Sequence, residues 1–233
     1  MKTLILIPTY NAQSKLLDVL TDIEVNAPGV DVLVIDHGSS DRTHHILKNN
    51  NINRLIMPLE TSYYHALSLG MYYAFKNKYD IVVEWDDKGK FPTSAIKHLV
   101  ATIKRTKCDL VLGSRYVNNK PPKGIRWTGT RALRKTIKVT TRQKITDPTL
   151  RLRAYGKKAI KIFAKYENIG PAPDSIALLL KNDFTFRESY AILEEGFKKQ
   201  LHSGYAHSTL EMMRWWAWIT FVLPFKRKMK KGN

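Results

Sequence analysis

Two adjacent carboxylates and a lysine close an apolar run near the middle of the chain, in the sequence VVEWDDKGKFP at 82–92. The apolar residues predict a buried strand, and Gly89 with the proline that follows predicts the turn that ends it. Ligands of open α/β sheets bind at the carboxyl ends of the strands, where Asp86, Asp87 and Lys88 would lie. Two acids there could hold a divalent cation against a diphosphate, since hard cations take oxygen ligands. The alternative is a solvated acidic turn.

Strands and helices alternate on either side of this turn. Apolar runs predict strands at 4–7, 30–35, 54–57, 79–85 and 109–112, and helical spacing predicts helices at 14–25, around 46–47, at 64–75 and at 94–103. This alternation indicates βαβ units and therefore an α/β fold with a mostly parallel sheet. Beyond residue 116 we expect a basic, loop-like stretch at 117–144, a short strand through Leu150 and Leu152, helices at 157–165 and 176–180, and a strand within 184–193.

Charge is distributed unevenly over the 233 residues, whose formal net charge is +19. Residues 1–100 hold 10 Lys and Arg against 11 Asp and Glu, whereas residues 101–233 hold 29 against 9. The basic half predicts a polyanionic partner, which we expect to be an anionic membrane surface rather than nucleic acid, because no nucleic-acid motif accompanies the charge. Cys108 is the single cysteine, which excludes an internal disulfide framework and fits a reducing compartment. The N-terminus predicts no signal peptide.

Five motifs, read in order, resemble family 2 glycosyltransferases, in particular those like dolichol-phosphate mannose synthase and bacterial polysaccharide or lipid glycosyltransferases. They are IPTYN at 7–11, IDHGSSDRT at 35–43, the WDDKGKFP turn at 85–92, GSRY at 113–116 and ITDPTLRLRAY at 145–155. The resemblance runs from about residue 4 to 193. It implies a GT-A fold, a Rossmann-like sheet flanked by helices, which binds a nucleotide-diphosphosugar of the UDP or GDP type, usually with Mg²⁺ or Mn²⁺.

The same resemblance implies roles for single residues on the donor side. A loop matches the one that holds the nucleotide base, and it comprises Pro8, Thr9, Tyr10 and Asn11. Asp36, followed by His37 and Gly38, matches an acid that contacts base or ribose. Asp86 matches the first acid of the DxD-like motif, beside the diphosphate and the metal, and Arg115 matches an arginine near the phosphates. Asp147 matches the acid of the family's DPTSGFRAY motif, on the acceptor side.

Departures from the family pattern gather at this site. Lys88 replaces the second acid of DxD, so three alternatives stand: Asp86 and Asp87 hold the metal, the Lys88 ammonium neutralises the diphosphate in its place, or the site is inactive. His37 replaces a second Asp and could hydrogen-bond a base or have a structural role. Leu150, Arg151 and Leu152 replace Ser-Gly-Phe. A catalytically silent relative that binds nucleotide or a partner in a glycan-assembly complex is therefore the alternative to an enzyme.

Acceptor chemistry depends on the nucleophile. The phosphate of a polyprenyl phosphate is already ionised, whereas a sugar hydroxyl of a polysaccharide needs a base within reach. Asp174 is the candidate, because an acid at a comparable place in relatives opens a helix on the acceptor side; its alternative role is a helix N-cap. An acceptor phosphate could be bound by arginines, for which the candidates are Arg131, Arg151 and Arg153.

The chain is predicted to divide into a GT-A domain at 1–205 and a tail at 206–233. Within the domain, 1–116 forms the nucleotide-binding half and 117–205 the basic acceptor-side half. Residues 215–225 include nine apolar residues out of eleven, too few to span a bilayer, and five Lys or Arg follow within 226–231. An amphipathic helix with a polybasic end predicts peripheral attachment to the cytoplasmic face of a membrane. Packing on the domain or on a partner, such as a membrane protein, is the alternative.

Overall fold

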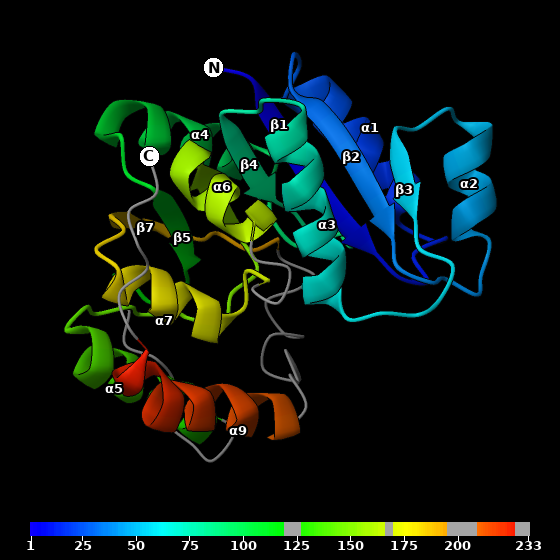
Figure 1. The fold of residues 1–233 in the computed structure, drawn as a ribbon. Coiled ribbons are helices and arrows are strands. Elements are labelled where there is room, and N and C mark those ends of the chain that lie inside the picture. Colours follow the sequence, from blue (N-terminus) through cyan, green and yellow to red (C-terminus); the bar gives the residue numbers. More distant parts are fainter. Residues whose placement is uncertain (119–126, 166–169, 195–208, 227–233) are drawn as a thin grey trace.

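The computed structural model describes residues 1–118, 127–165, 170–194 and 209–226 (Figure 1). The strands are β1 (Thr3–Thr9), β2 (Asp31–Asp36), β3 (Arg54–Ile56), β4 (Ile81–Glu84), β5 (Leu110–Ser114), β6 (Arg153–Gly156) and β7 (Phe186–Tyr190). They form one sheet of order β3-β2-β1-β4-β6-β5-β7. Every neighbouring pair is parallel except those of β6, which runs antiparallel to β4 and β5. The predicted mostly parallel α/β sheet is confirmed.

Helices cover both faces of the sheet. The α-helices of the described residues are α1 (Leu16–Asn26), α2 (Thr43–Asn49), α3 (Tyr63–Lys76), α4 (Ser94–Thr106), α5 (Thr128–Thr141), α6 (Lys157–Lys165), α7 (Pro173–Lys181) and α9 (Thr209–Ala217). Strand β1 is buried along its whole length because its side chains alternate between two cores. Leu4 and Leu6 pack on the side of α3 and α6, while Ile5 and Ile7 pack on the side of α1 and α4. This two-sided burial explains why the predicted strands are uninterrupted apolar runs in the sequence.

A layer of C-terminal helices lies below α7 in Figure 1, away from α1 and α2. It consists of α5 and of α9 with its continuation, a π-helical turn (Trp218–Val222) and a 3-10 turn (Leu223–Phe225). The continuous helical segment 209–225 packs on α5 and α7 through Trp215, Ile219 and Leu223, which are all fully buried. The helical part of the predicted tail therefore packs on the domain. None of the helices in the described part of the chain is long and apolar enough to cross a bilayer.

Two expectations for the basic half were wrong. The stretch 117–144, expected to be loop-like, contains helix α5, because Thr130, Leu133 and Ile137 recur at helical spacing and are buried beneath its many cations. The strand expected through Leu150 and Leu152 begins only at Arg153, although both leucines are buried. The other predicted elements form with bounds shifted by a few residues, and the helix expected at 157–165 has those bounds. The boundaries at 116 and 205 stay predictions.

Candidate active site

Three loops meet at the carboxyl edge of the sheet because β2, β1 and β4 are neighbours in the order. Thr9 pairs with Asp36 in the register of β1 and β2, and the amide of His37 donates to the Thr9 carbonyl oxygen at 3.1 Å. On the other side, the amide of Trp85 donates to the carbonyl oxygen of Leu6 at 2.9 Å. The sequence-predicted segments 8–11, 36–38 and 86–88 therefore lie side by side, as expected for a ligand site at this edge.

Side chains of the first two loops hold each other in place. The Asn11 side-chain oxygen accepts from the amide of Ser40 at 2.9 Å, and the Asn11 amide donates to the Ser39 hydroxyl at 2.9 Å. Asp36 is 1% exposed, and its carboxylate accepts from the Ser39 amide at 2.9 Å. Gly38 has a φ of +101°, and a Cβ there would lie 2.5 Å from the Glu60 Cα. Asp36 and Gly38 thus shape the loop. Because Asp36 is almost fully buried, its contact with any ligand is limited.

An aromatic pair faces this edge. The Tyr10 and His37 rings stack with centroids 5.5 Å apart and planes at 19°. The Tyr10 hydroxyl donates to Glu60 at 3.0 Å, and this hydrogen bond raises the pKa of Tyr10. His37 Nδ1 lies 2.9 Å from the Thr61 carbonyl oxygen, which fixes the ring's orientation. A stacked pair of this kind suits a planar heterocycle such as a nucleotide base.

The carboxylates of Asp86 and Asp87 point in different directions. Asp86 is 6% exposed and accepts from the backbone amides of Lys88 at 2.8 Å and Lys90 at 3.3 Å. Burial raises the pKa of Asp86, against the opposing effect of Lys90. Asp87 instead accepts from the Thr9 hydroxyl at 3.0 Å, across the gap to β1. The described residues contain no cluster of three or more His, Cys, Asp or Glu side chains fit for a metal ion. Asp86 and Asp87 are therefore held by different partners, and their role as a metal-binding pair stays a prediction.

Cations accompany this turn. Lys88 is exposed, whereas Lys90 is partly buried and burial lowers the pKa of its ammonium group. Arg151, at the position of the family's glycine, lies with its guanidinium carbon 4.0 Å from the centre of the Tyr63 ring. Of these cations, Lys90 acts on Asp86 directly, because its charge lowers the pKa of the Asp86 carboxyl.

A buried polar cluster, which the sequence reasoning missed, lies beneath the turn. Glu84 is fully buried and accepts from the hydroxyls of Tyr63 at 2.8 Å and Tyr155 at 2.6 Å. Arg153, 2% exposed, donates to the carbonyl oxygens of Pro171 at 2.6 Å and Pro148 at 2.8 Å. These bonds enclose the Arg153 guanidinium in the core and correct its expected role as an acceptor-binding residue. The sequence signal that could have revealed the buried role of Glu84 was that it is the single charged residue inside the apolar run VVEW.

Arg115 and Asp147 form an ion pair with each other. Arg115 Nε donates to Asp147 at 2.6 Å and its Nη2 donates to the second oxygen at 2.9 Å, giving a bidentate pair. Their side chains are 9% and 0% exposed. The two residues were assigned to phosphate and acceptor binding separately, whereas the structure brings them together in a buried contact. Arg131, another acceptor candidate, lies on the exposed side of α5.

Removing one partner of this pair is expected to destabilise the fold. Asp147→Ala leaves the Arg115 charge buried without its carboxylate, so we expect a loss of about 3–5 kcal/mol in the free energy of unfolding, measured by urea denaturation. The double variant Asp147→Ala/Arg115→Met should regain part of this loss because it removes the unpaired charge. Equal stability of the single variant and the parent chain would contradict the structural role.

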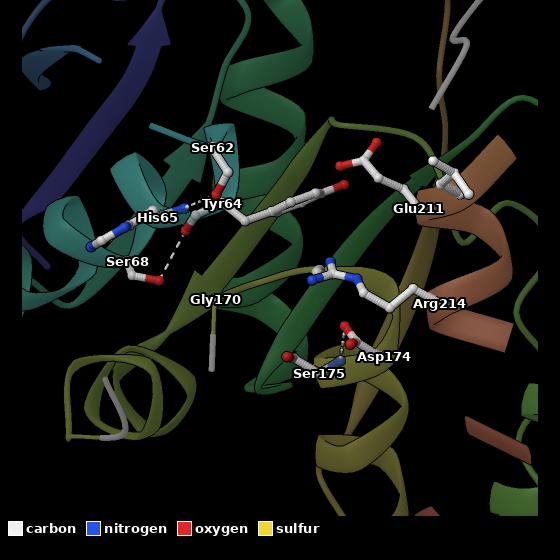
Figure 2. Close-up of a pocket in the computed structure, with 11 residues that line it drawn as sticks. Ser62, Tyr64, His65, Ser68, Gly170, Asp174, Ser175, Glu211 and Arg214 are labelled. Atoms are coloured by element: carbon white, nitrogen blue, oxygen red, sulfur yellow. Dashed lines mark hydrogen bonds between the residues drawn. The ribbon is translucent and has the colours of Figure 1, made fainter. Parts of the chain in front are cut away.

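A pocket of about 460 Å³ borders the N-terminal part of α3 (Figure 2). Its wall begins at Ser62, the residue after Thr61, whose carbonyl oxygen contacts His37. Asp174, at the first turn of α7, lines the pocket, as do Arg214 and Glu211 of α9. Figure 2 shows the Arg214 guanidinium extending over Asp174. The further lining residues are Tyr64, His65, Ser68, Gly170, Ala172, Ser175 and Leu210.

Electrostatics in the pocket centre on Asp174. Burial raises the pKa of the Asp174 carboxyl, and the hydrogen bond from the Ser175 amide at 2.9 Å and the nearby Arg214 charge oppose this effect. A partly buried carboxylate with a raised pKa, surrounded by hydroxyl groups, can accept a proton from a bound alcohol. Sequence reasoning found Asp174 but missed Arg214, because nothing local to α9 indicates that it reaches this pocket.

The sheet and its carboxyl-edge loops form an α/β fold with a candidate ligand site at the carboxyl edge. The chain belongs to glycosyl transferase family 2, whose family model matches residues 4–163. Among curated proteins, it is similar to polyprenol monophosphomannose synthase of Mycolicibacterium smegmatis, with 26% identity over 122 residues. That match covers 50% of this chain and 46% of the relative, so it spans about half of each.

Solved structures share the fold at low identity. Glucosyl-3-phosphoglycerate synthase from Mycobacterium tuberculosis in complex with UDP superposes with a TM-score of 0.62 at 13% identity, covering 94% of this chain and 80% of that one. The same enzyme in complex with Mn²⁺ and UDP-glucose gives a TM-score of 0.59 at 13% identity, covering 86% and 74%. These likenesses support the GT-A fold of this chain.

Proposed function

We propose that this chain transfers a sugar from a nucleotide-diphosphosugar, of the UDP or GDP type, to a hydroxyl of a lipid-linked or polysaccharide acceptor at a membrane surface. The observation that carries the proposal is the adjacency of two sites: the aromatic and acidic carboxyl edge of the sheet, and the Asp174 pocket. They are joined through residues 61 and 62. A donor on one side and an acceptor on the other would meet at the first turn of α3.

The donor would lie across the loops of β1, β2 and β4. Tyr10 and His37 offer a stacking face for the base, with Pro8, Thr9 and Asn11 forming the loop beside it, and Asp36 and Gly38 shaping the opposing one. The diphosphate would lie toward Asp86 and Lys88. A structural neighbour binds Mn²⁺ with UDP-glucose, and when bound here a divalent ion would stabilise the charge of the departing diphosphate.

The metal dependence of nucleotide binding depends on where the carboxylates of Asp86 and Asp87 point. Because Asp86 already accepts from its own turn and Asp87 from Thr9, we propose that Lys88 supplies charge neutralisation in place of a tightly held metal. UDP or GDP binding, measured by calorimetry, is expected to persist in EDTA and to weaken about tenfold in Lys88→Gln. The matched control is Lys97→Gln, which changes an exposed lysine of α4. Binding that appears only with Mn²⁺ would instead assign the metal to Asp86 and Asp87.

The acceptor assignment rests on Asp174. A carboxylate would repel an acceptor phosphate, whereas it can take the proton of a sugar hydroxyl as the new glycosidic bond forms and the nucleoside diphosphate leaves. The curated relative is a polyprenol monophosphomannose synthase, which keeps polyprenyl phosphate as the second candidate acceptor. Arg151 and Arg214 are the cations that would serve such a phosphate.

Transfer from radiolabelled UDP- and GDP-sugars is the test, with polyprenyl phosphate, a lipid-linked sugar and a soluble polysaccharide offered in parallel. We expect labelled product with an acceptor that carries a sugar hydroxyl. Nucleotide binding without transfer to any of these acceptors would favour the silent relative that works within a glycan-assembly complex, where a membrane protein is the expected partner.

A further inference from the structure

Segment 209–225 carries a second apolar face in addition to the buried one. Five large apolar side chains point outward along it, with exposed fractions between 39% and 85%: Leu210, Met213, Trp216, Phe221 and Phe225. The Trp216 and Phe221 rings contact each other edge to face at 5.9 Å on this side. Such a ridge of exposed apolar residues on one segment differs from the scattered apolar residues normal on a protein surface and is typical of an interaction site.

The segment is held firmly while its outer face stays exposed. The Trp215 ring packs edge to face on Tyr64 of the pocket wall at 5.8 Å. At the other end, the Lys181 ammonium group donates to the carbonyl oxygens of Leu223 at 2.5 Å and Pro224 at 2.8 Å. This ammonium closes the C-terminal end of the segment, where backbone carbonyls are otherwise unsatisfied. The ridge is therefore a fixed part of the domain surface.

Cations flank the ridge. Helix α5 packs beside α9 and contains no Asp or Glu; its exposed positions include Arg131, Lys135 and Lys138. At the far end the sequence continues from Phe225 into a polybasic stretch at 226–231. Exposed aromatic side chains next to the α5 cations match the interface of an anionic bilayer, where rings lie at headgroup level and Lys and Arg meet anionic lipid.

We infer that the outer faces of α5 and segment 209–225 together dock on an anionic lipid bilayer and place the mouth of the Asp174 pocket at its surface. Leu210 belongs to both the ridge and the pocket wall, and Arg214 extends from the same helix over Asp174 (Figure 2). A lipid-linked acceptor would thus reach the pocket from the membrane. This part of the inference rests on the proposed function. A second copy of the chain is disfavoured as the occupant because its own α5 cations would be repelled.

Sedimentation with vesicles tests this surface without nucleotide. The full chain is expected to bind vesicles of phosphatidylglycerol and phosphatidylcholine, and to leave pure phosphatidylcholine largely unbound. Trp216→Ser/Phe221→Ser and Lys135→Glu/Lys138→Glu should each weaken partitioning about tenfold or more. Matched controls change exposed residues elsewhere: Val25→Ser/Tyr72→Ser on α1 and α3, and Lys97→Glu/Lys104→Glu on α4.

Nucleotide calorimetry on the same variants separates the surface from the enzyme. Unchanged UDP or GDP binding with lost vesicle binding supports the docking face independently of catalysis. Vesicle binding that persists in both ridge and α5 variants would overturn the inference. The inference would also be overturned if the chain did not bind anionic vesicles but formed a dimer, and if Trp216→Ser/Phe221→Ser dissociated that dimer. This face would then be a contact between copies of the chain.

Discussion

Replacing Asp174 with asparagine is expected to lower the rate of sugar transfer by about 10²–10⁴-fold, the usual contribution of a positioned general base. The amide keeps an oxygen that can accept from the Ser175 amide, so the start of α7 should be preserved. Nucleotide binding should be unchanged, because Asp174 lines the pocket proposed for the acceptor and not the carboxyl-edge loops. Single-turnover transfer and calorimetry on one protein sample measure both quantities.

Stability provides the control for this variant. Burial raises the folded pKa of Asp174 above its unfolded value near 4. The carboxyl therefore contributes stability at a pH below the unfolded pKa, and this is lost as the pH rises through the folded pKa. Near neutral pH the buried charge costs stability, so Asp174→Asn should melt at the parent's temperature or above. A full transfer rate in Asp174→Asn would leave Asp174 as a helix cap and favour a phosphate acceptor.

The pH profile of transfer should follow the same carboxyl. As the proposed base, Asp174 must be ionised for transfer, so the rate is expected to rise with pH through its raised pKa. Arg214 lowers that pKa, so Arg214→Gln should move the acidic limb of the profile to higher pH. The other titratable groups that line the pocket are Glu211, His65 and Tyr64. An acidic limb that does not move in Arg214→Gln would belong to a group other than Asp174.

The second large effect is expected at Asp86. Asp86→Ala removes the carboxylate that accepts from the Lys88 and Lys90 amides, so the turn that carries these cations loses its anchor. We expect transfer to fall about 10²–10³-fold, the range seen when one group that stabilises developing charge is lost. Asp86→Asn retains an accepting oxygen but not the charge. A large loss in Asp86→Ala with a small loss in Asp86→Asn would show that Asp86 acts through the turn, and full activity in both would exclude it from the site.

The sequence was most informative where local pattern and burial agree. Strand β1 and the turn at Asp86 were predictable because a strand buried on both faces is an uninterrupted apolar run, and the motif order placed the loops along one edge. A basic amphipathic helix was predicted near 157–165, and α6 lies at Lys157–Lys165.

Contacts distant in sequence were beyond local reasoning. Arg153 carries a charge typical of a binding residue, yet the antiparallel pairing of β6 with β4 places it beside Glu84 in the core. Arg115 and Asp147 each match a motif, but only the fold joins them. Helix α5 was hidden because its cations outnumber the few apolar residues that pack inward.

The most direct test of the central claim is calorimetric titration of the purified chain with UDP, GDP and their sugars, alongside Asp86→Ala. The carboxyl edge of the sheet is predicted to bind one of these nucleotides at a single site, with binding weakened in the variant and preserved in Asp174→Asn. Failure of every nucleotide to bind, with or without Mn²⁺, would contradict a nucleotide-sugar donor site and with it the proposed transferase.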